Sequence, residues 1–221
     1  RSRVRMLALI KVGLIDSGVS EAQLQLVANQ RDFTGNGTVV DQLAHGSAIV
    51  DRLLSAQVDI EICVARIFAD QLLCGVEECA AAVDWLVGLE PSLITMSFGL
   101  RRDSRILREA CSAAVEAGVG IVAASPAQGQ PVYPAHYPGV LRATGDARCG
   151  MTEIAWLNSE QADVGGYVGD PAAGPAGASI GCASVAARLL TLIVEHPGEA
   201  FTDVVRLLQD TADYRGRERR Q

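Results

Sequence analysis

Short apolar runs alternate with segments of helical spacing along most of this chain, and this alternation constrains its fold more than any other feature. Five runs have the character of buried strands: residues 9–16, 59–67, 92–99, 119–125 and 140–145. Apolar residues recur at helical spacing within residues 43–54, 76–86, 107–114, 177–196 and 203–212. Strands that alternate with helices in this way form a parallel sheet covered by helices on both faces. The sequence therefore predicts an α/β protein with three layers, α/β/α, around a mostly parallel central sheet.

The length and charge of the chain limit its organisation and its partners. With 221 residues, 49% of them apolar, the chain can fill the core of one α/β domain. We expect a single domain over residues 1–215, followed by a basic flexible tail at 216–221. The net charge of −7 repels phosphate, and no apolar run reaches the ~18 residues of a membrane span. We therefore expect neither nucleic acid nor a membrane as a partner.

The six cysteines show no metal-binding or disulfide spacing. They are unevenly spread, form no CxxC pair and do not cluster with histidines. A chain that can build a full apolar core does not need disulfides to fold, so we expect buried, reduced thiols and a cytoplasmic location. No aspartate-rich run suggests a calcium site, and we expect no metal and no cofactor.

The histidines are few enough to be weighed one by one as general bases. His196 precedes a proline at a predicted helix end, and His136 lies in a loop between two prolines. His45 instead begins the run His-Gly-Ser at the head of a predicted helix. Asp16 ends the first strand, and in parallel sheets reactive groups gather at the carboxyl ends of strands. His45 and Asp16 are therefore the residues to examine for chemistry.

Several segments resemble the motifs of the subtilisin-like serine proteases. VGLIDSG (12–18) is similar to the aspartate motif of that family, HGSAIV (45–50) to its histidine motif, and GASIGCASVAARLL (177–190) to its serine motif. ITMSFG (94–99) resembles the substrate-binding strand, and YPAHYPGVLRATG (133–145) resembles the Tyr-Pro-Ala loop and the strand after it. The likeness covers nearly the whole chain, and the motifs occur in the order Asp, His, Ser.

The resemblance implies a role for each residue of an Asp-His-Ser triad. Ser179 would be the nucleophile, His45 the general base and acid, and Asp16 the group that orients the imidazole. A serine hydroxyl needs this help because it is a poor nucleophile until a neighbouring imidazole takes its proton. The backbone N–H of Ser179, at the start of a helix, would also stabilise the oxyanion.

A second serine motif can be set aside. The stretch Gly177-Ala-Ser179-Ile-Gly181 fits the Gly-x-Ser-x-Gly elbow of the α/β-hydrolases. In those enzymes an aspartate and then a histidine follow the serine, and a strand precedes the elbow. Here His196 comes before Asp203, and a loop rich in Gly and Pro precedes Gly177. The subtilisin-like assignment is therefore preferred.

The oxyanion region departs from the family pattern. Pro126 and Ala127 stand where the family has a glycine and an asparagine whose amide stabilises the tetrahedral intermediate. Gln128 is the candidate replacement donor, beside the N–H of Ser179. Cys182 follows Ser179 closely and is expected to be a small packing residue rather than a second nucleophile. The chain starts at its first strand, so we expect a minimal form without an inhibitory propeptide.

The resemblance also indicates where a substrate would bind. Ser97, Phe98 and Gly99 match the segment that pairs with an extended substrate, and Ser125 and Pro126 would line the primary pocket. In size and minimal form, the chain is similar to subtilisin-like proteases dedicated to one precursor. We expect an endopeptidase that removes a leader from a precursor peptide, within a maturation complex. The alternative is a weak or inactive module of the same fold that binds a peptide or protein partner.

Overall fold

The central sheet of the protein is mostly parallel. A computed structural model describes residues 9–172 and 174–217. Its nine-stranded sheet has the order β2-β3-β1-β4-β5-β6-β8-β7-β9, and only the pairing of β7 with β8 is antiparallel. The strands are β1 (Ile10–Asp16), β2 (Val27–Asp32), β3 (Ile60–Arg66), β4 (Leu93–Met96), β5 (Gly120–Ala124), β6 (Leu141–Gly145), β7 (Ile154–Trp156), β8 (Val164–Gly166) and β9 (Tyr214–Arg215).

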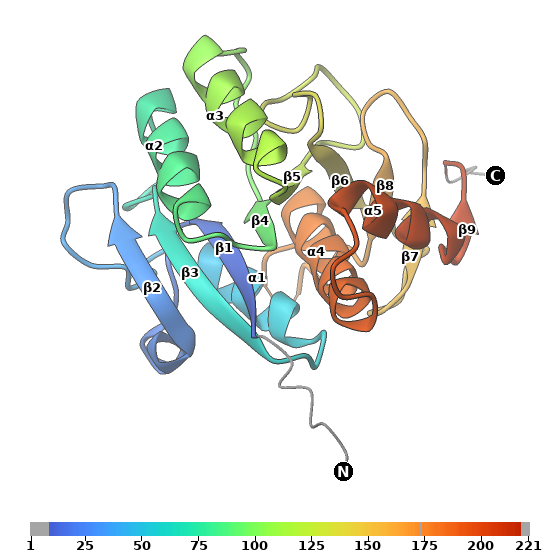
Figure 1. Ribbon diagram of the computed structural model, residues 1–221, viewed down its shortest axis with the longest axis horizontal. Helices are drawn as coiled ribbons and strands as arrows, with labels where there is room; N and C mark the ends of the chain where they lie inside the picture. Colours follow the sequence, from blue (N-terminus) through green and yellow to red (C-terminus); the bar gives the residue numbers. More distant parts are fainter. Residues whose placement is uncertain (1–8, 173, 218–221) are drawn as a thin grey trace.

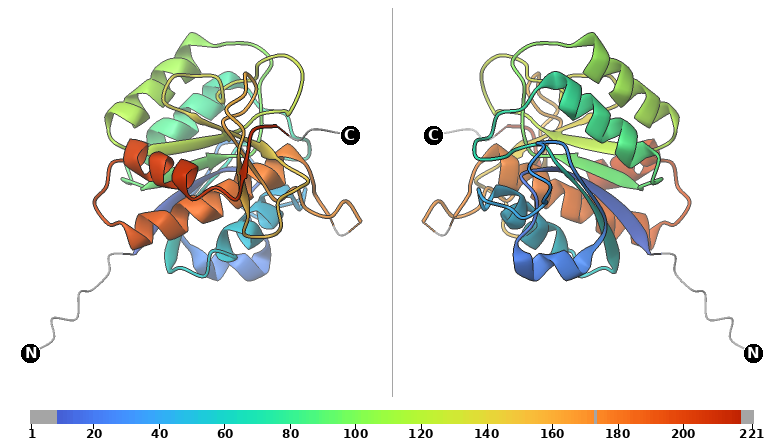
Figure 2. Two further views of the ribbon diagram at one scale, coloured as in Figure 1. Left: turned by 90° about the vertical axis from the view of Figure 1, so that its right-hand side faces the viewer. Right: turned by 90° about the vertical axis from the view of Figure 1, so that its left-hand side faces the viewer.

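Helices cover both faces of this sheet, which confirms the predicted three layers (Figure 1). The helices are α1 (His45–Leu54), α2 (Val76–Val87), α3 (Arg105–Glu116), α4 (Ala178–Glu195), α5 (Phe201–Asp210) and the short 3-10 helix η1 (Glu21–Leu26). Figure 2 shows α2 and α3 on one side of the sheet and α1 and α4 on the other. Leu14 and Ile15 illustrate why β1 is apolar throughout, since these fully buried neighbours point into opposite layers.

Helix α4 is the central helix of its layer. It has 18 residues and a mean hydropathy of 1.5, so its length and composition alone would allow it to cross a membrane. Its apolar side chains are instead buried in one core with side chains of the sheet, α1 and α5. The apolar character of α4 is therefore that of a core helix, and its first turn lies beside the end of β4.

Four strands were not predicted from the sequence. Strand β2 lies at the edge of the sheet, and all its residues are half-buried or exposed, so no buried apolar run marks it in the sequence. Strands β7, β8 and β9 have only two or three residues each, too few to produce a periodic pattern. After β9, the N–H of Gly216 donates to Trp156 O, and Arg217 donates to Gln161 Oε1. Residues 1–8 and 218–221, which belong to the predicted domain and tail, lie outside the described residues.

All six cysteines are free thiols, and five of them are buried. Cys74 is half-buried, and its Sγ lies 3.2 Å from Sγ of Cys79 at the start of α2. The hydrogen bond between the two thiols lowers the pKa of Cys74 and, together with burial, raises the pKa of Cys79. The remaining four thiols are Cys63, Cys111, Cys149 and Cys182.

Candidate active site

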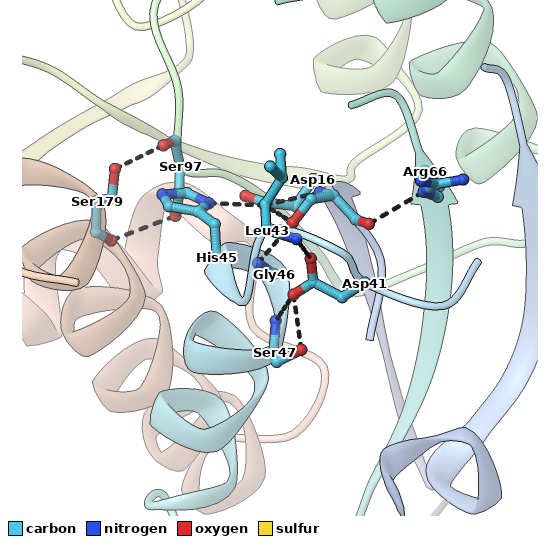
Figure 3. A network of polar contacts seen from close by, with 10 residues as sticks. Asp16, Asp41, Leu43, His45, Gly46, Ser47, Arg66, Ser97 and Ser179 are labelled. Carbon is cyan, nitrogen blue, oxygen red and sulfur yellow. Dashed lines mark hydrogen bonds and ion pairs between the residues drawn. The ribbon is translucent and has the colours of Figure 1, made fainter. Parts of the chain in front are cut away.

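Strand β1 carries Asp16 to the carboxyl edge of the sheet, where it is fully buried. One carboxylate oxygen, Oδ1, accepts hydrogen bonds from the N–H of Ser17 at 2.7 Å and from its hydroxyl at 3.1 Å. The same oxygen lies 2.7 Å from Nδ1 of His45, 29 residues further along the chain (Figure 3). The other oxygen, Oδ2, is buried with no partner among the described residues. Asp16 is therefore fixed in place and directed at the imidazole.

Helix α1 begins at His45, and a second carboxylate organises its first turn. Oδ2 of Asp41 accepts from the N–H of Ser47 at 2.8 Å and from its hydroxyl at 2.6 Å, while Oδ1 accepts from the N–H of Leu43 at 2.8 Å. Burial alone would raise the pKa of Asp41, but these hydrogen bonds outweigh it and lower the pKa. A carboxylate at this position also complements the positive end of the helix dipole.

The two carboxylates determine the electrostatics of the imidazole. Burial would lower the pKa of His45, because it penalises the charged ring. The hydrogen bond and charge of Asp16, with the charge of Asp41, outweigh that effect and raise the pKa above its usual value. Since Nδ1 faces the carboxylate, it carries the proton in this pair, and Nε2 is the nitrogen left for chemistry.

A buried arginine holds the turn after Asp16. Arg66, the last residue of β3, is fully buried and donates to the carbonyl oxygen of Ser17 at 3.2 Å, of Thr38 at 3.1 Å and of Ala69 at 3.1 Å. Its Nη1 also lies 3.8 Å from Oδ1 of Asp32. Sequence reasoning missed this residue, although a charged side chain at the end of an apolar strand was a signal for it.

Ser179 is the second residue of α4 and is half-buried. Its hydroxyl donates to the carbonyl oxygen of Ser97 at 2.8 Å, and the hydroxyl of Ser97 donates to the carbonyl oxygen of Ser179 at 3.3 Å. In Figure 3, His45 lies between this serine pair and Asp16. The structure thus joins Asp16 to His45 and Ser97 to Ser179, while no hydrogen bond links His45 to Ser179 in the described part of the chain.

The predicted oxyanion and pocket residues follow β5. Ser125 is buried, its N–H donates to Ala143 O at 2.8 Å, and its hydroxyl has no partner among the residues described. Pro126 is half-buried, and Ala127 and Gln128 are exposed. Ala127 and Gln128 line a cavity of about 460 Å³ that is also bordered by the end of β6. No hydrogen bond connects Gln128 to the triad residues within the described ranges.

The predicted substrate strand continues from Ser97. Phe98 packs edge-on against Phe68, with ring centroids 5.4 Å apart, so its ring is partly a core side chain. Gly99 is exposed, and a Cβ there would lie 2.7 Å from a methyl carbon of Val132. Leu100 then pairs with Tyr133, since each N–H donates to the carbonyl oxygen of the other at 2.7 and 2.8 Å.

The other candidate reactive groups lie elsewhere. The ring of His136 is bonded to the carbonyl oxygens of Val132 and Glu160, and His196 is exposed beyond α4. Cys182 is fully buried, and burial raises its thiol pKa to about 12, as expected for a packing residue. Over residues 9–172 and 174–217, no three His, Cys, Asp or Glu side chains are grouped so that they could hold a metal ion.

The chain is similar to known proteins in sequence and in structure. No protein-family model matches it. It is 31% identical over 146 residues to the minor extracellular protease Epr of Bacillus subtilis (strain 168), an alignment that covers 60% of this chain and 22% of that relative. The chain therefore spans about a fifth of the length of this relative.

Two solved structures share the fold. The nisin leader peptidase NisP from Lactococcus lactis superposes with a TM-score of 0.69 and 16% identity, covering 90% of this chain and 81% of that one. The S41 psychrophilic protease superposes with a TM-score of 0.65 and 16% identity, covering 91% and 82% of the two chains. At this identity, the likeness to these structures shows the fold. These two structures show that the chain has the subtilisin-like α/β fold, and its sequence likeness to Epr extends over 60% of its length.

Proposed function

We propose that this chain is a serine endopeptidase with Asp16, His45 and Ser179 as its catalytic triad. The observation that carries the proposal is the 2.7 Å contact between Oδ1 of Asp16 and Nδ1 of His45, which leaves Nε2 free on the side of Ser179. Ser179 opens α4 at the same edge of the sheet. The relatives named above are themselves called proteases or peptidases, which supports this class of reaction.

The geometry supports the following steps. The hydroxyl of Ser179 turns from Ser97 O toward His45, and Nε2 takes its proton as Oγ attacks the scissile carbonyl. The N–H of Ser179, near the positive end of α4, stabilises the oxyanion. His45 then gives the proton to the leaving amine, which departs as the carbonyl re-forms. Water hydrolyses the acyl-enzyme by the same proton transfers, while Asp16 stabilises the imidazolium. Apo enzymes often show such catalytic hydrogen bonds unformed before substrate binds.

The proposed substrate is a precursor peptide from which a leader is removed. One structural neighbour is a leader peptidase, and the exposed segment at Gly99 suits an extended peptide. The γ-subunit of quinohemoprotein amine dehydrogenase is our candidate precursor, because the chain resembles in size and cysteine-containing form the protease that matures this subunit. Cleavage within a maturation complex, and in the cytoplasm, is part of this proposal. Six free thiols are compatible with a reducing compartment.

Labelling by a small fluorophosphonate tests the proposed activity. We expect one phosphonyl group per chain, attached to Ser179, and no labelling of Ser179→Ala. His45→Ala should reduce the labelling rate to background because Oγ then has no base. His136→Ala is the matched control, because the ring of His136 is bonded only to backbone oxygens and its loss should leave the rate unchanged. Stable wild-type protein that does not label would refute the endopeptidase.

A specific observation favours a second candidate, a peptide-binding module without activity. Pro126 and Ala127 replace the expected oxyanion residues, and the hydroxyl of Ser179 is bonded to a backbone oxygen rather than to the base. A binding module would hold the intact precursor equally well with serine or alanine at position 179. It would release no leader after prolonged incubation.

A further inference from the structure

A cavity of about 670 Å³ lies between the proposed substrate strand and the loop after β5. Of the residues that the structure describes, one charged residue, Arg101, lines it among uncharged neighbours: Pro126, Gln130, Pro131, Val132 and Tyr133. No acidic side chain among those residues contributes to its wall. The cavity therefore offers one positive charge among uncharged polar and apolar groups.

Two of the residues that line this cavity connect it to the proposed active site: Pro126 is an expected primary-pocket residue, and Arg101 follows the proposed substrate strand. The carbonyl oxygen of Ser97 accepts from the Ser179 hydroxyl at 2.8 Å. Four residues further on, the same segment reaches Arg101, and the pairing of Leu100 with Tyr133 holds Arg101 beside the cavity wall that contains Tyr133. Val132, which lines the cavity, also lies close to Gly99, since a Cβ on Gly99 would be 2.7 Å from one of its methyl carbons. If Pro126 lines the primary pocket, as expected, the side chain of the substrate residue beside the scissile bond would face this cavity.

Arg101 and Arg102 differ from the next two arginines along the chain, which form ion pairs with acidic side chains. Arg105 pairs with Glu109 at 2.8 Å, and Arg108 pairs with Asp103. Arg101 and Arg102 are both exposed, and neither makes a hydrogen bond or ion pair within the described part of the chain. Of these two, only Arg101 lines the cavity. In a protein with net charge −7, an unpaired guanidinium at a cavity wall is a feature that a carboxylate would complement.

We propose that Arg101 selects a carboxylate side chain, aspartate or glutamate, at the substrate residue on the acyl side of the scissile bond. This specificity rests on the proposed endopeptidase function. The guanidinium supplies the charge-assisted hydrogen bonds, and Pro126, Val132 and Tyr133 contact the aliphatic part of the side chain. Pro126 and Tyr133 are half-buried and cover part of the ion pair, which strengthens it relative to one on an open surface.

Binding to the Ser179→Ala variant tests the pocket without requiring catalysis. The probes are fluorescein-labelled peptide amides that are identical except for a C-terminal Glu, Gln, Leu or Lys, with affinity read from anisotropy. We expect the Glu peptide to bind about tenfold more tightly than the Gln peptide, with a preference that declines as salt rises. Introducing Arg101→Glu into the Ser179→Ala variant should abolish the preference for the Glu peptide and make the Lys peptide bind more tightly. Arg102→Glu, the matched exposed control, should retain the preference for Glu.

Two measurements separate this inference from the proposed function. Fluorophosphonate labelling of the protein with Ser179 intact tests the triad, because that reagent has no side chain to occupy the cavity. Equal binding of the Glu and Gln peptides, or the same response to Arg101→Glu and Arg102→Glu, would overturn the role of Arg101 whether or not Ser179 labels. A Glu preference without labelling would uphold the pocket and refute the peptidase.

Discussion

Gly46 and Gly18 touch at the point where α1 meets the turn after β1. A Cβ on Gly46 would lie 2.2 Å from the carbonyl oxygen of Gly18, closer than any side chain can approach backbone. The N–H of Gly46 meanwhile donates to the hydroxyl of Ser17 at 2.9 Å. The absence of a side chain at Gly46 therefore allows the first turn of α1 to lie close enough for His45 to reach Asp16.

The first prediction concerns this contact. Gly46→Ala should destabilise the protein by about 1–3 kcal/mol, because backbone on both sides must move to admit the methyl group. It should also slow the labelling of Ser179, because the shift displaces His45 from Asp16. Gly88→Ala is the control: this residue has a helical φ of −63°, and its Cβ would meet nothing closer than 3.4 Å. Urea unfolding and fluorophosphonate labelling are measured for both variants and for the wild type. If Gly46→Ala and Gly88→Ala had the same stability and the same labelling rate, the packing argument would be contradicted.

The second prediction is a pH dependence set by His45. Asp16 and Asp41 raise the pKa of His45 in the folded protein, and only the neutral ring can accept the proton of Ser179. The labelling rate should therefore increase with pH, with a midpoint above the usual histidine value of about 6.5. The stability that protonated His45 contributes has the opposite trend. It is present in full below the usual pKa and is lost as pH rises through the raised one.

The Asp16→Asn variant tests whether Asp16 controls the pH dependence of both labelling and stability. Removing the charge should move the midpoint of labelling to lower pH and weaken the pH dependence of unfolding that His45 provides. The plateau rate should fall by about 10⁴, since an amide no longer favours the tautomer with the proton on Nδ1. The measurements are labelling rates and urea unfolding across pH 5–9. A variant with an unchanged midpoint would show that Asp16 does not control the imidazole.

Much of the fold and part of the site could be predicted from the sequence. Asp16 and His45 could be predicted as site residues, because each lies in a short motif at one end of a strand or helix pattern. The position of Arg66 at the end of an apolar strand was a signal, but its role could not be predicted, because its partners are backbone oxygens that only folding brings together. Arg101 is similar, since its place beside Pro126 and Tyr133 depends on a loop without regular structure. The hydroxyl orientation of Ser179 likewise follows from the proximity of β4 and α4.

The third prediction concerns the oxyanion. If the side chain of Gln128 moves to the site when substrate binds, Gln128→Ala should lower turnover of a cleaved precursor by about 10²–10³, a magnitude that itself comes from a subtilisin asparagine. Its KM should change little, because the donor acts in the transition state. Gln25→Ala is a control of the same type, because Gln25 is exposed on η1, outside the proposed site. A turnover that Gln128→Ala leaves unchanged would remove this side chain from the mechanism and leave the N–H of Ser179 as the proposed donor.

The last prediction concerns the buried arginine behind the site. Replacing Arg66 with methionine removes the donors to Ser17, Thr38 and Ala69 while retaining much of the volume. The carbonyl oxygens then lose their partners in a buried region, and Asp32 loses a neighbouring charge at 3.8 Å. We expect a loss of about 3–5 kcal/mol in the free energy of unfolding. Arg105→Met, which breaks an exposed pair with Glu109, should cost less than about 1 kcal/mol.

Because Arg66 holds the turn that directs Asp16 at His45, the folded fraction of Arg66→Met should also label more slowly at Ser179. Normal labelling of that fraction would limit Arg66 to a role in stability.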